Sequence, residues 1–129
     1  MESVTETCVV PVSSERVFQF LSELENLPRW STQFVKELVT VNGKRKAVTP
    51  IGEVFIRLDA NPNAGLIDIY AGPDEQHMNP AYLRIIRFSG ELTAVTFTFF
   101  KWADTDYATW NVFCRWIKIE VENIRKHFS

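Results

Sequence analysis

The sequence has few of the residues from which metal, redox and covalent sites are built. Among 129 residues there are two histidines, His77 and His127, and two cysteines, Cys8 and Cys114, none at a zinc-ligand spacing from another. The five glycines form no phosphate-binding loop, and no Gly-x-Ser-x-Gly turn is present. We therefore expect no metal and no cofactor. The cysteines are interpreted as small buried hydrophobic residues, with a disulfide or redox pair as the alternative.

A large excess of charge is also missing. The net charge is −2, and the only basic cluster, Lys44-Arg45-Lys46, follows the turn dipeptide Asn42-Gly43. Because nucleic-acid binding needs several lysines and arginines that converge on phosphates, we expect no nucleic-acid partner. The cluster is interpreted as the solvated tip of a hairpin, with a binding patch as the alternative.

Long apolar runs are absent as well, so no membrane span is predicted. The first residues lack the basic and apolar regions of an export signal, and we expect the protein to be cytoplasmic. The composition, 46% hydrophobic and 23% charged, is typical of globular proteins. A chain of this length fits one domain, predicted over residues 1–129.

What the sequence does contain is one long amphipathic pattern over residues 105–129. Apolar residues at steps of three and four predict a helix about 36 Å long with one hydrophobic stripe. The stripe consists of Trp110, Phe113, Cys114, Ile117, Val121, Ile124 and Phe128. Such a helix has to bury this stripe against another layer of the fold.

The preceding residues predict an antiparallel sheet with two short helices near its start. A strand at Val4–Val10 precedes a helix that is capped by Ser13 and ends near Pro28, and a second helical turn covers Glu25–Ser31. Three hairpins follow: Phe34–Val41 with Lys44–Thr49 around a type I′ turn, Glu53–Ala60 with Gly65–Ala71, and Tyr82–Phe88 with Glu91–Lys101 around Ser89-Gly90. Residues 72–80 are interpreted as a polar loop. The predicted fold class is α+β, with six to seven antiparallel strands wrapped around the long C-terminal helix.

The hairpins imply specific pairings. Alignment of Ala60 with Gly65 predicts an aliphatic inner face for the second hairpin and places Arg57 opposite Asp68 on the outer face. In the last hairpin, the two-residue turn places Tyr82 and Arg84 on the inner face with Phe97 and Phe99, whereas a three-residue turn would reverse this relation.

An inward Arg84 would need an anionic partner, because guanidinium does not lose its proton. That partner is either a protein carboxylate such as Asp68, in a structural ion pair, or an anionic group of a ligand. In the second case Arg84 would stabilise an oxyanion in an enzyme.

Several segments carry a resemblance to a known family. They are Val12-Ser13-Ser14-Glu15-Arg16-Val17-Phe18, Leu27-Pro28-Arg29-Trp30, Gly52-Glu53-Val54 and Asp68-Ile69-Tyr70-Ala71-Gly72-Pro73. With the element order, they resemble the SRPBCC superfamily, which comprises START, birch-pollen-allergen-like and polyketide cyclase/dehydrase-like domains with the helix-grip fold. The resemblance implies a cavity under the last helix. It does not select among lipid or hormone carriers, aromatic polyketide cyclases and coenzyme Q-binding chaperones, and no catalytic residue is carried over.

The candidate cavity residues are mainly aromatic, and packing in the core is the alternative for each. They are Trp30, Phe34, Tyr82, Arg84, Phe97, Phe99, Tyr107 and Trp110. Trp and Tyr near the ends of elements combine an apolar body with a polar atom, which suits a cavity mouth. His77 is the general-base candidate, with simple exposure in a loop as the alternative.

We therefore predict that the chain binds a hydrophobic or aromatic small molecule between the sheet and the last helix. An enzyme of the polyketide cyclase or dehydratase kind is one alternative, which convergent polar groups such as Tyr82, Arg84 and Tyr107 would favour. A protein-interaction module with a filled core is another, and a homodimer is possible under each of these predictions.

Overall fold

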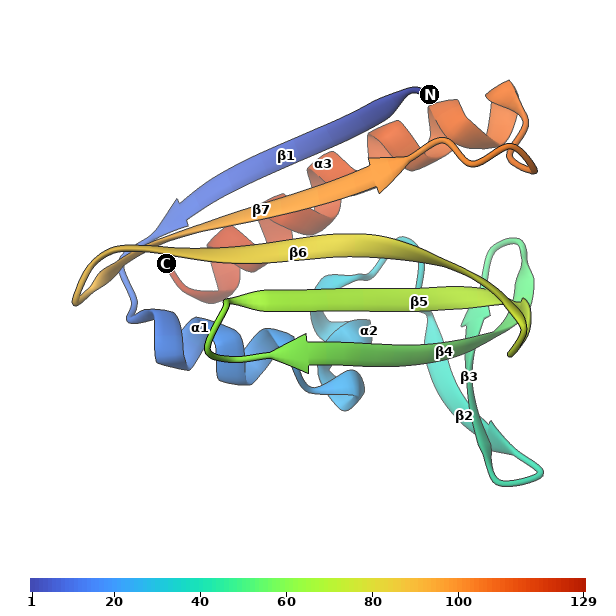
Figure 1. Ribbon diagram of the computed structural model, residues 1–129, viewed down its shortest axis with the longest axis horizontal. Coiled ribbons are helices and arrows are strands. Elements are labelled where there is room, and N and C mark those ends of the chain that lie inside the picture. Colours follow the sequence, from blue (N-terminus) through green and yellow to red (C-terminus); the bar gives the residue numbers. More distant parts are fainter.

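The computed structural model describes residues 1–129 as a seven-stranded antiparallel sheet with three α-helices on one side (Figure 1). The strand order is β1-β7-β6-β5-β4-β3-β2, so the first and last strands pair while every other neighbour is joined by a hairpin. The elements are β1 (Ser3–Val10), α1 (Ser14–Leu21), the 3-10 turn η1 (Leu24–Asn26), α2 (Leu27–Trp30), β2 (Glu37–Val41), β3 (Lys44–Thr49), β4 (Gly52–Asn61), β5 (Leu66–Asp74), β6 (His77–Ser89), β7 (Leu92–Phe100) and α3 (Tyr107–His127). The predicted fold class is confirmed.

The two short helices form where the sequence places a cap and a proline. Ser13 is extended, and its side chain accepts a hydrogen bond from the Arg16 N–H at 3.4 Å, which starts α1. Helix α1 has eight residues and ends earlier than predicted, because the chain turns through η1 before Pro28 starts α2. These helices carry the chain from the β1 edge of the sheet to the β2 edge (Figure 1).

The first hairpin forms around the predicted turn, but its first strand starts at Glu37 instead of the predicted Phe34. Asn42 and Gly43 have φ angles of 51° and 76°, as a type I′ turn requires. The basic residues beside it are paired one by one with acids: Lys44 with Glu75 at 3.3 Å, Arg45 with Glu25 at 2.5 Å and Lys46 with Glu53 at 3.9 Å. Each basic side chain of the cluster thus has its own acidic neighbour at the protein surface.

The second hairpin keeps the predicted faces but not the predicted partners. Asn61, not Ala60, is the last paired residue of β4, and it lies opposite Leu66. The pairing register is therefore shifted by two residues from the predicted one, and an even shift keeps the aliphatic face inside. Arg57 lies opposite Tyr70, so the predicted pair of Arg57 with Asp68 is wrong. Gly65 belongs to the turn, at φ 66°, where a Cβ would lie 2.4 Å from the carbonyl oxygen of Ile85.

The last hairpin has a different register from the predicted one. Ser89 pairs with Leu92, and the register shifts between Arg87 and Ser89, so β6 holds one extra residue as a bulge. Leu83 therefore lies opposite Phe97, on the inner face, and Arg84 lies opposite Thr96 on the outer face. The inward placement of Tyr82 and Arg84 is wrong, because one added residue reverses the faces of a strand.

Residues 72–80 form a continuation of the sheet instead of a loop. Strand β5 runs to Asp74 and β6 starts at His77, with an irregular register between Ala71 and Asp74. Gly72 allows this close approach, because a Cβ there would lie 1.9 Å from the His77 carbonyl oxygen. The longer hairpin forms one rim of the concave side of the sheet.

The core lies between the helices and the inner face of the sheet. Helix α3 contributes Ile117, Val121 and Ile124, which pack with Val17 and Leu21 of α1 and with the sheet residues Val10, Ile56, Ile67, Leu83 and Val95. Cys8 is buried in this core, whereas Cys114 is partly exposed, and both are free thiols. Helix α3 thus docks through the predicted stripe.

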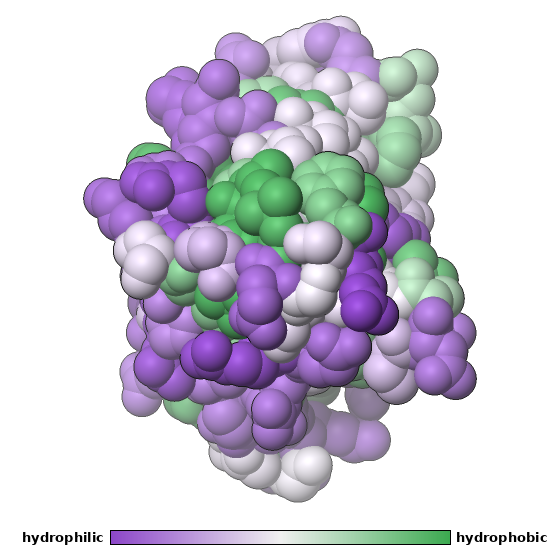
Figure 2. All heavy atoms as spheres, turned by 90° about the vertical axis from the view of Figure 1, so that its left-hand side faces the viewer, coloured by the Kyte–Doolittle hydropathy of each residue, from purple (hydrophilic) through white to green (hydrophobic).

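Hydrophobic side chains gather on the surface at one end of the molecule (Figure 2). Figure 2 shows a patch of hydrophobic side chains at the end of the molecule where the β6–β7 turn lies. The exposed apolar residues of this turn are Ile86, Phe88 and Leu92. None of the helices combines the length and hydropathy that a membrane crossing requires.

The docking of α3 predicts that two isoleucines close together on this helix contribute very differently to the free energy of unfolding. Ile117→Ala should lower the free energy of unfolding by about 2 to 5 kcal/mol, because Ile117 is fully buried and its loss leaves a cavity. Ile119→Ala, at a position that is 43% exposed on the same helix, should change it by less than about 1 kcal/mol. Urea unfolding measures both, and equal effects would mean that α3 does not dock through the Ile117 face.

Candidate functional site

A cavity of about 410 Å³ lies between the concave face of the sheet, the first half of α3 and the segment that follows α2. Its size is within the range of small-molecule sites. The lining is mainly apolar and comprises Leu27, Ser31, Phe34, Val35, Ile51, Val54, Ile69, Ala71, Gly72, Pro73, Asn79, Pro80, Ala81, Phe97, Phe99, Phe100, Trp102, Asp104, Thr105, Asp106, Thr109, Phe113, Trp116 and Glu120.

The space exists because the sheet presents small residues under α3. Ala81 lies directly opposite Ile69, and Ala71 follows two residues later on the same face of β5. With Gly72 beside them, these positions leave room that larger side chains would fill. The C-terminal half of α3, in contrast, packs on larger aliphatic residues of the core.

Aromatic rings form a continuous wall of the cavity. The ring centroids of Phe97 and Phe99 are 4.8 Å apart, and those of Phe99 and Phe113 are 6.3 Å apart. Trp116 continues the wall at 5.4 Å from Phe113 and 6.4 Å from Phe34. Such edge and tilted contacts hold the rings in place and leave aromatic surface for a ligand.

Glu120 is the one charged side chain buried in this apolar site, with 1% of its surface exposed. Its Oε2 accepts hydrogen bonds from the backbone N–H groups of Gln33 at 3.1 Å and Phe34 at 3.0 Å. Burial raises the pKa of Glu120 to about 7, although these hydrogen bonds, the Ser31 side chain and the charge of Lys36 act in the opposite direction. The carboxyl group therefore changes protonation near neutral pH.

A second side chain of α3 holds the same segment. The Asn123 amide donates to the carbonyl oxygen of Trp30 at 3.0 Å and to the Thr32 hydroxyl at 2.9 Å. Glu120 and Asn123 are three residues apart and so lie on one face of the helix. Together they fix residues 30–34 against α3, and this contact closes one side of the cavity.

Polar residues gather where the β7–α3 connection meets the β5–β6 hairpin. Asp106 caps α3 by accepting a hydrogen bond from the Thr109 N–H at 2.7 Å, and this bond lowers the pKa of Asp106. Asp104 accepts a hydrogen bond from the Asn79 amide at 3.4 Å. Both aspartates are exposed, so this region is the mouth of the cavity.

The structure divides the predicted site residues into three groups. Phe34, Phe97 and Phe99 line the cavity, and their role in ligand binding stays a prediction. Trp30 and Trp110 are buried next to it without lining it, and Trp30 packs edge-on against Phe97 at 5.4 Å. Their aromatic bodies belong to the core.

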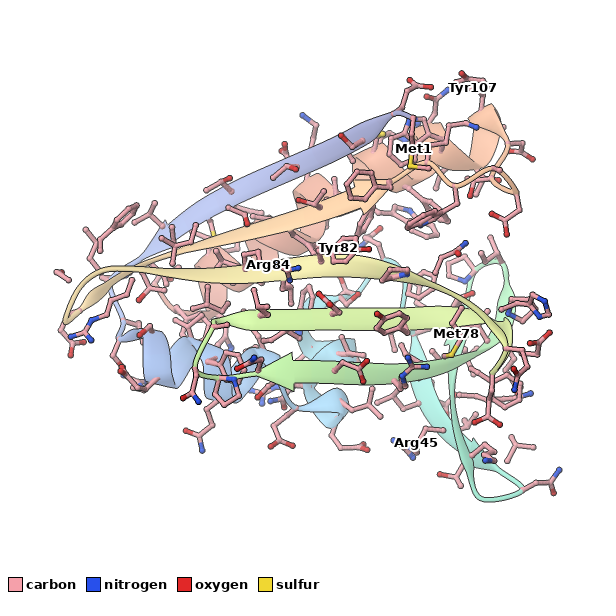
Figure 3. All side chains as sticks on the ribbon, viewed as in Figure 1. Met1, Arg45, Met78, Tyr82, Arg84 and Tyr107 are labelled. Atoms are coloured by element: carbon pink, nitrogen blue, oxygen red, sulfur yellow. The ribbon has the colours of Figure 1, made fainter.

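Three predicted site residues lie outside the cavity. Tyr107, the first residue of α3, is 62% exposed, and the Lys101 ammonium lies over its ring at 4.5 Å. Tyr82 and Arg84 are on the side of β6 that faces away from the helices (Figure 3). Their placement in the cavity is wrong for the register reason given above.

The partner of Arg84 is a protein carboxylate. Its Nη1 lies 2.8 Å from Oδ1 of Asp68, on the outer face of the sheet. The alternative of a ligand anion at Arg84 is therefore excluded by geometry. His77 does not line the cavity either: its side chain is 76% exposed at the β5–β6 turn and its Nδ1 lies 2.8 Å from Asp74.

The sequence prediction missed Glu120 and Trp116. Glu120 is three residues after Ile117 and four before Ile124, so it interrupts the apolar stripe of the predicted helix. A carboxylate at such a position is a recognisable signal, because it is buried when the helix docks. The interrupted stripe alone does not reveal which groups bind the Glu120 carboxylate.

The buried carboxyl group predicts a specific dependence of stability on pH. Because the pKa of Glu120 is raised from 4.5 to about 7, the folded state binds more protons than the unfolded state in this range. Its contribution to the unfolding free energy should therefore fall as pH rises from 4.5 to 7, by about 3 kcal/mol in total.

The variant Glu120→Gln isolates this contribution, since glutamine keeps an acceptor oxygen and cannot ionise. Its unfolding free energy should lack this fall, whereas contributions from other groups such as His127 are common to both proteins. Denaturant unfolding at several pH values measures the difference. Parallel curves for the two proteins would contradict a raised pKa at Glu120.

Comparisons with known proteins identify the fold. No protein-family model and no curated protein matches the chain. Among solved structures, the Zhui aromatase/cyclase from a Streptomyces species superimposes with a TM-score of 0.74 at 12% identity, covering 98% of this chain and 92% of that one. A START superfamily protein from Mycobacterium smegmatis has a TM-score of 0.64 at 12% identity, covering 98% and 96%.

The Aha1 protein from Colwellia psychrerythraea, solved as a dimer, has a TM-score of 0.70 at 15% identity over 99% of this chain and 96% of that one. These identities are low, whereas the superpositions include almost every residue. The comparisons, like the element order, therefore show that the chain has the helix-grip fold.

Proposed function

We propose that the protein binds a hydrophobic or aromatic small molecule in the cavity under α3. The observation that supports this function is the space of about 410 Å³ with a continuous aromatic wall. The lining is mainly apolar, so an apolar ligand that occupies this space removes apolar surface from water, which favours binding. A START protein and an aromatase/cyclase are among the solved structures with this fold.

The composition of the cavity lining favours ligand binding over catalysis by the polar residues that the sequence suggested. Tyr82, Arg84 and Tyr107 would have favoured an enzyme, and none of them lines the cavity. The interaction-module alternative predicted a filled core, which the cavity does not support. Binding of a ligand by apolar contact is thus the function with the most support.

Glu120 favours one second candidate, an enzyme of the polyketide cyclase or dehydratase kind. A carboxyl group with a pKa of about 7 is able to give or take a proton near neutral pH. It lines the cavity together with Ser31. Turnover of an aromatic substrate that is lost in Glu120→Gln, with ligand binding retained, would favour this candidate.

A substitution that fills the cavity tests the proposed binding. Ala81→Phe places a ring in the space under α3 and should weaken binding of the uncharged fluorophore N-phenylnaphthylamine by about tenfold or more. Thr96→Phe adds the same ring on the outer face of β7 and should leave binding unchanged. Fluorescence titration gives both affinities, and equal binding by the two variants would show that the probe does not occupy the cavity.

The position of the Arg84–Asp68 ion pair on the outer face predicts that its loss leaves the affinity for the ligand unchanged. Arg84→Leu removes the bond to Asp68 and should cost less than about 1 kcal/mol in stability, because both side chains are partly solvated. Binding of the same fluorophore should be unchanged. A large loss of fluorophore affinity in this variant would mean that the Arg84 side chain lies in the cavity, which would contradict the observed register.

A further inference from the structure

The cavity lining carries negative charge only. Its ionisable residues are Asp104 and Asp106 at the mouth and Glu120 inside, and it includes no lysine, arginine or histidine. Two lysines lie nearby, but both are engaged elsewhere. The Lys36 ammonium donates to the Thr32 carbonyl oxygen at 2.8 Å, and the Lys101 ammonium lies over the Tyr107 ring.

Glu120 consequently has no ion-pair partner in the protein. The backbone donors of Gln33 and Phe34 both bind Oε2, the Ser31 side chain is a further hydrogen-bonding partner of the carboxylate, and the charge of Lys36 acts on it without forming an ion pair. Burial of a carboxylate without a counterion is costly, and a cation brought by a ligand would compensate it. Oε1 accepts neither of the two backbone hydrogen bonds, so it is the oxygen at which such a cation would bind.

The aromatic rings beside Glu120 also favour a cationic ligand group. Phe34, Phe113 and Trp116 line the cavity within one connected aromatic cluster, and Glu120 lies one helical turn after Trp116. Aromatic faces attract ammonium groups, most strongly where water is excluded. An apolar ligand that carries a positive charge would therefore find both a counterion and aromatic surface.

We propose that the ligand of this cavity is a hydrophobic or aromatic amine, bound as the cation with its nitrogen at the Glu120 carboxylate. The proposal rests on the binding function proposed above and specifies the chemical class of its ligand. Fatty acids and aromatic carboxylates are excluded, because their anionic group would meet three carboxylates and no basic side chain.

Three compounds with the same ring system test the charge preference. Naphthylmethylamine, naphthylmethanol and naphthoic acid differ in charge and share their apolar body. Calorimetric titration at about pH 8, where both Glu120 and the amine are charged, should show the amine binding about tenfold or more tightly than the alcohol and the acid more weakly than either.

The outcomes separate this proposal from the binding function. If the acid binds as tightly as the amine, or the alcohol equals the amine, the cavity binds apolar ligands and the amine proposal is overturned. If none of the three compounds binds, the binding function itself fails, and the amine proposal fails with it.

Variants then locate the positive charge. Glu120→Gln should lose about tenfold or more of the amine affinity while the affinity for the alcohol stays within about threefold. The control Glu122→Gln, two residues along the same helix in an exposed pair with Arg125, should change neither. Equal loss of both ligands in Glu120→Gln would mean that Glu120 only holds residues 31–35 in place, which overturns its role in the proposal.

The carboxylates at the cavity mouth are the alternative binding position for the ammonium nitrogen of the ligand. Asp104→Asn and Asp106→Asn keep the hydrogen-bonding shape of the mouth, since asparagine also caps helices, and remove its charge. Because these aspartates are exposed and screened by salt, the two variants should alter amine affinity by less than about threefold. A larger effect here than in Glu120→Gln would place the ammonium at the mouth and overturn the assignment to Glu120.

Discussion

The docking of α3 onto the concave face of the sheet is the contact on which the rest of the structure depends. Pairing of β1 with β7 brings the first strand next to the strand that leads into this helix. The C-terminal half of α3 then fills the core with Ile117, Val121 and Ile124, while its first half lies over the small residues of β5 and β6. One amphipathic helix thus both stabilises the fold and roofs the cavity.

Glu120 lies between the core residues Ile117 and Val121 of α3 and also lines the cavity, so it connects the core to the cavity. Its carboxylate satisfies two backbone N–H groups after α2, so the segment that closes the cavity depends on α3. The same burial raises the pKa of the group, so ionisation of the buried carboxyl group costs stability at neutral pH. Retention of a charge at such a cost is typical of functional positions, where groups are arranged for a ligand instead of for packing alone.

The two errors in strand register illustrate how strongly a face depends on a single residue. In the β4–β5 hairpin the shift was even, and the aliphatic side remained inside although every partner changed. In the β6–β7 hairpin one bulged residue reversed the strand, so Arg84 moved from the predicted cavity to an outer pair with Asp68. A bulge of this kind follows from how the turn fits its neighbours, which local sequence does not specify.

The sequence by itself determined the order of the helices and strands, the type I′ turn at Asn42-Gly43 and the apolar stripe of α3, because periodicity and turn chemistry are local properties. It also indicated the helix-grip fold and an aromatic cavity, of which Phe34, Phe97 and Phe99 line the wall. Only the tertiary structure decided which polar group lies inside. Glu120 meets Gln33 and Phe34 across more than eighty residues of chain, and contacts between such distant segments arise only when the layers pack together.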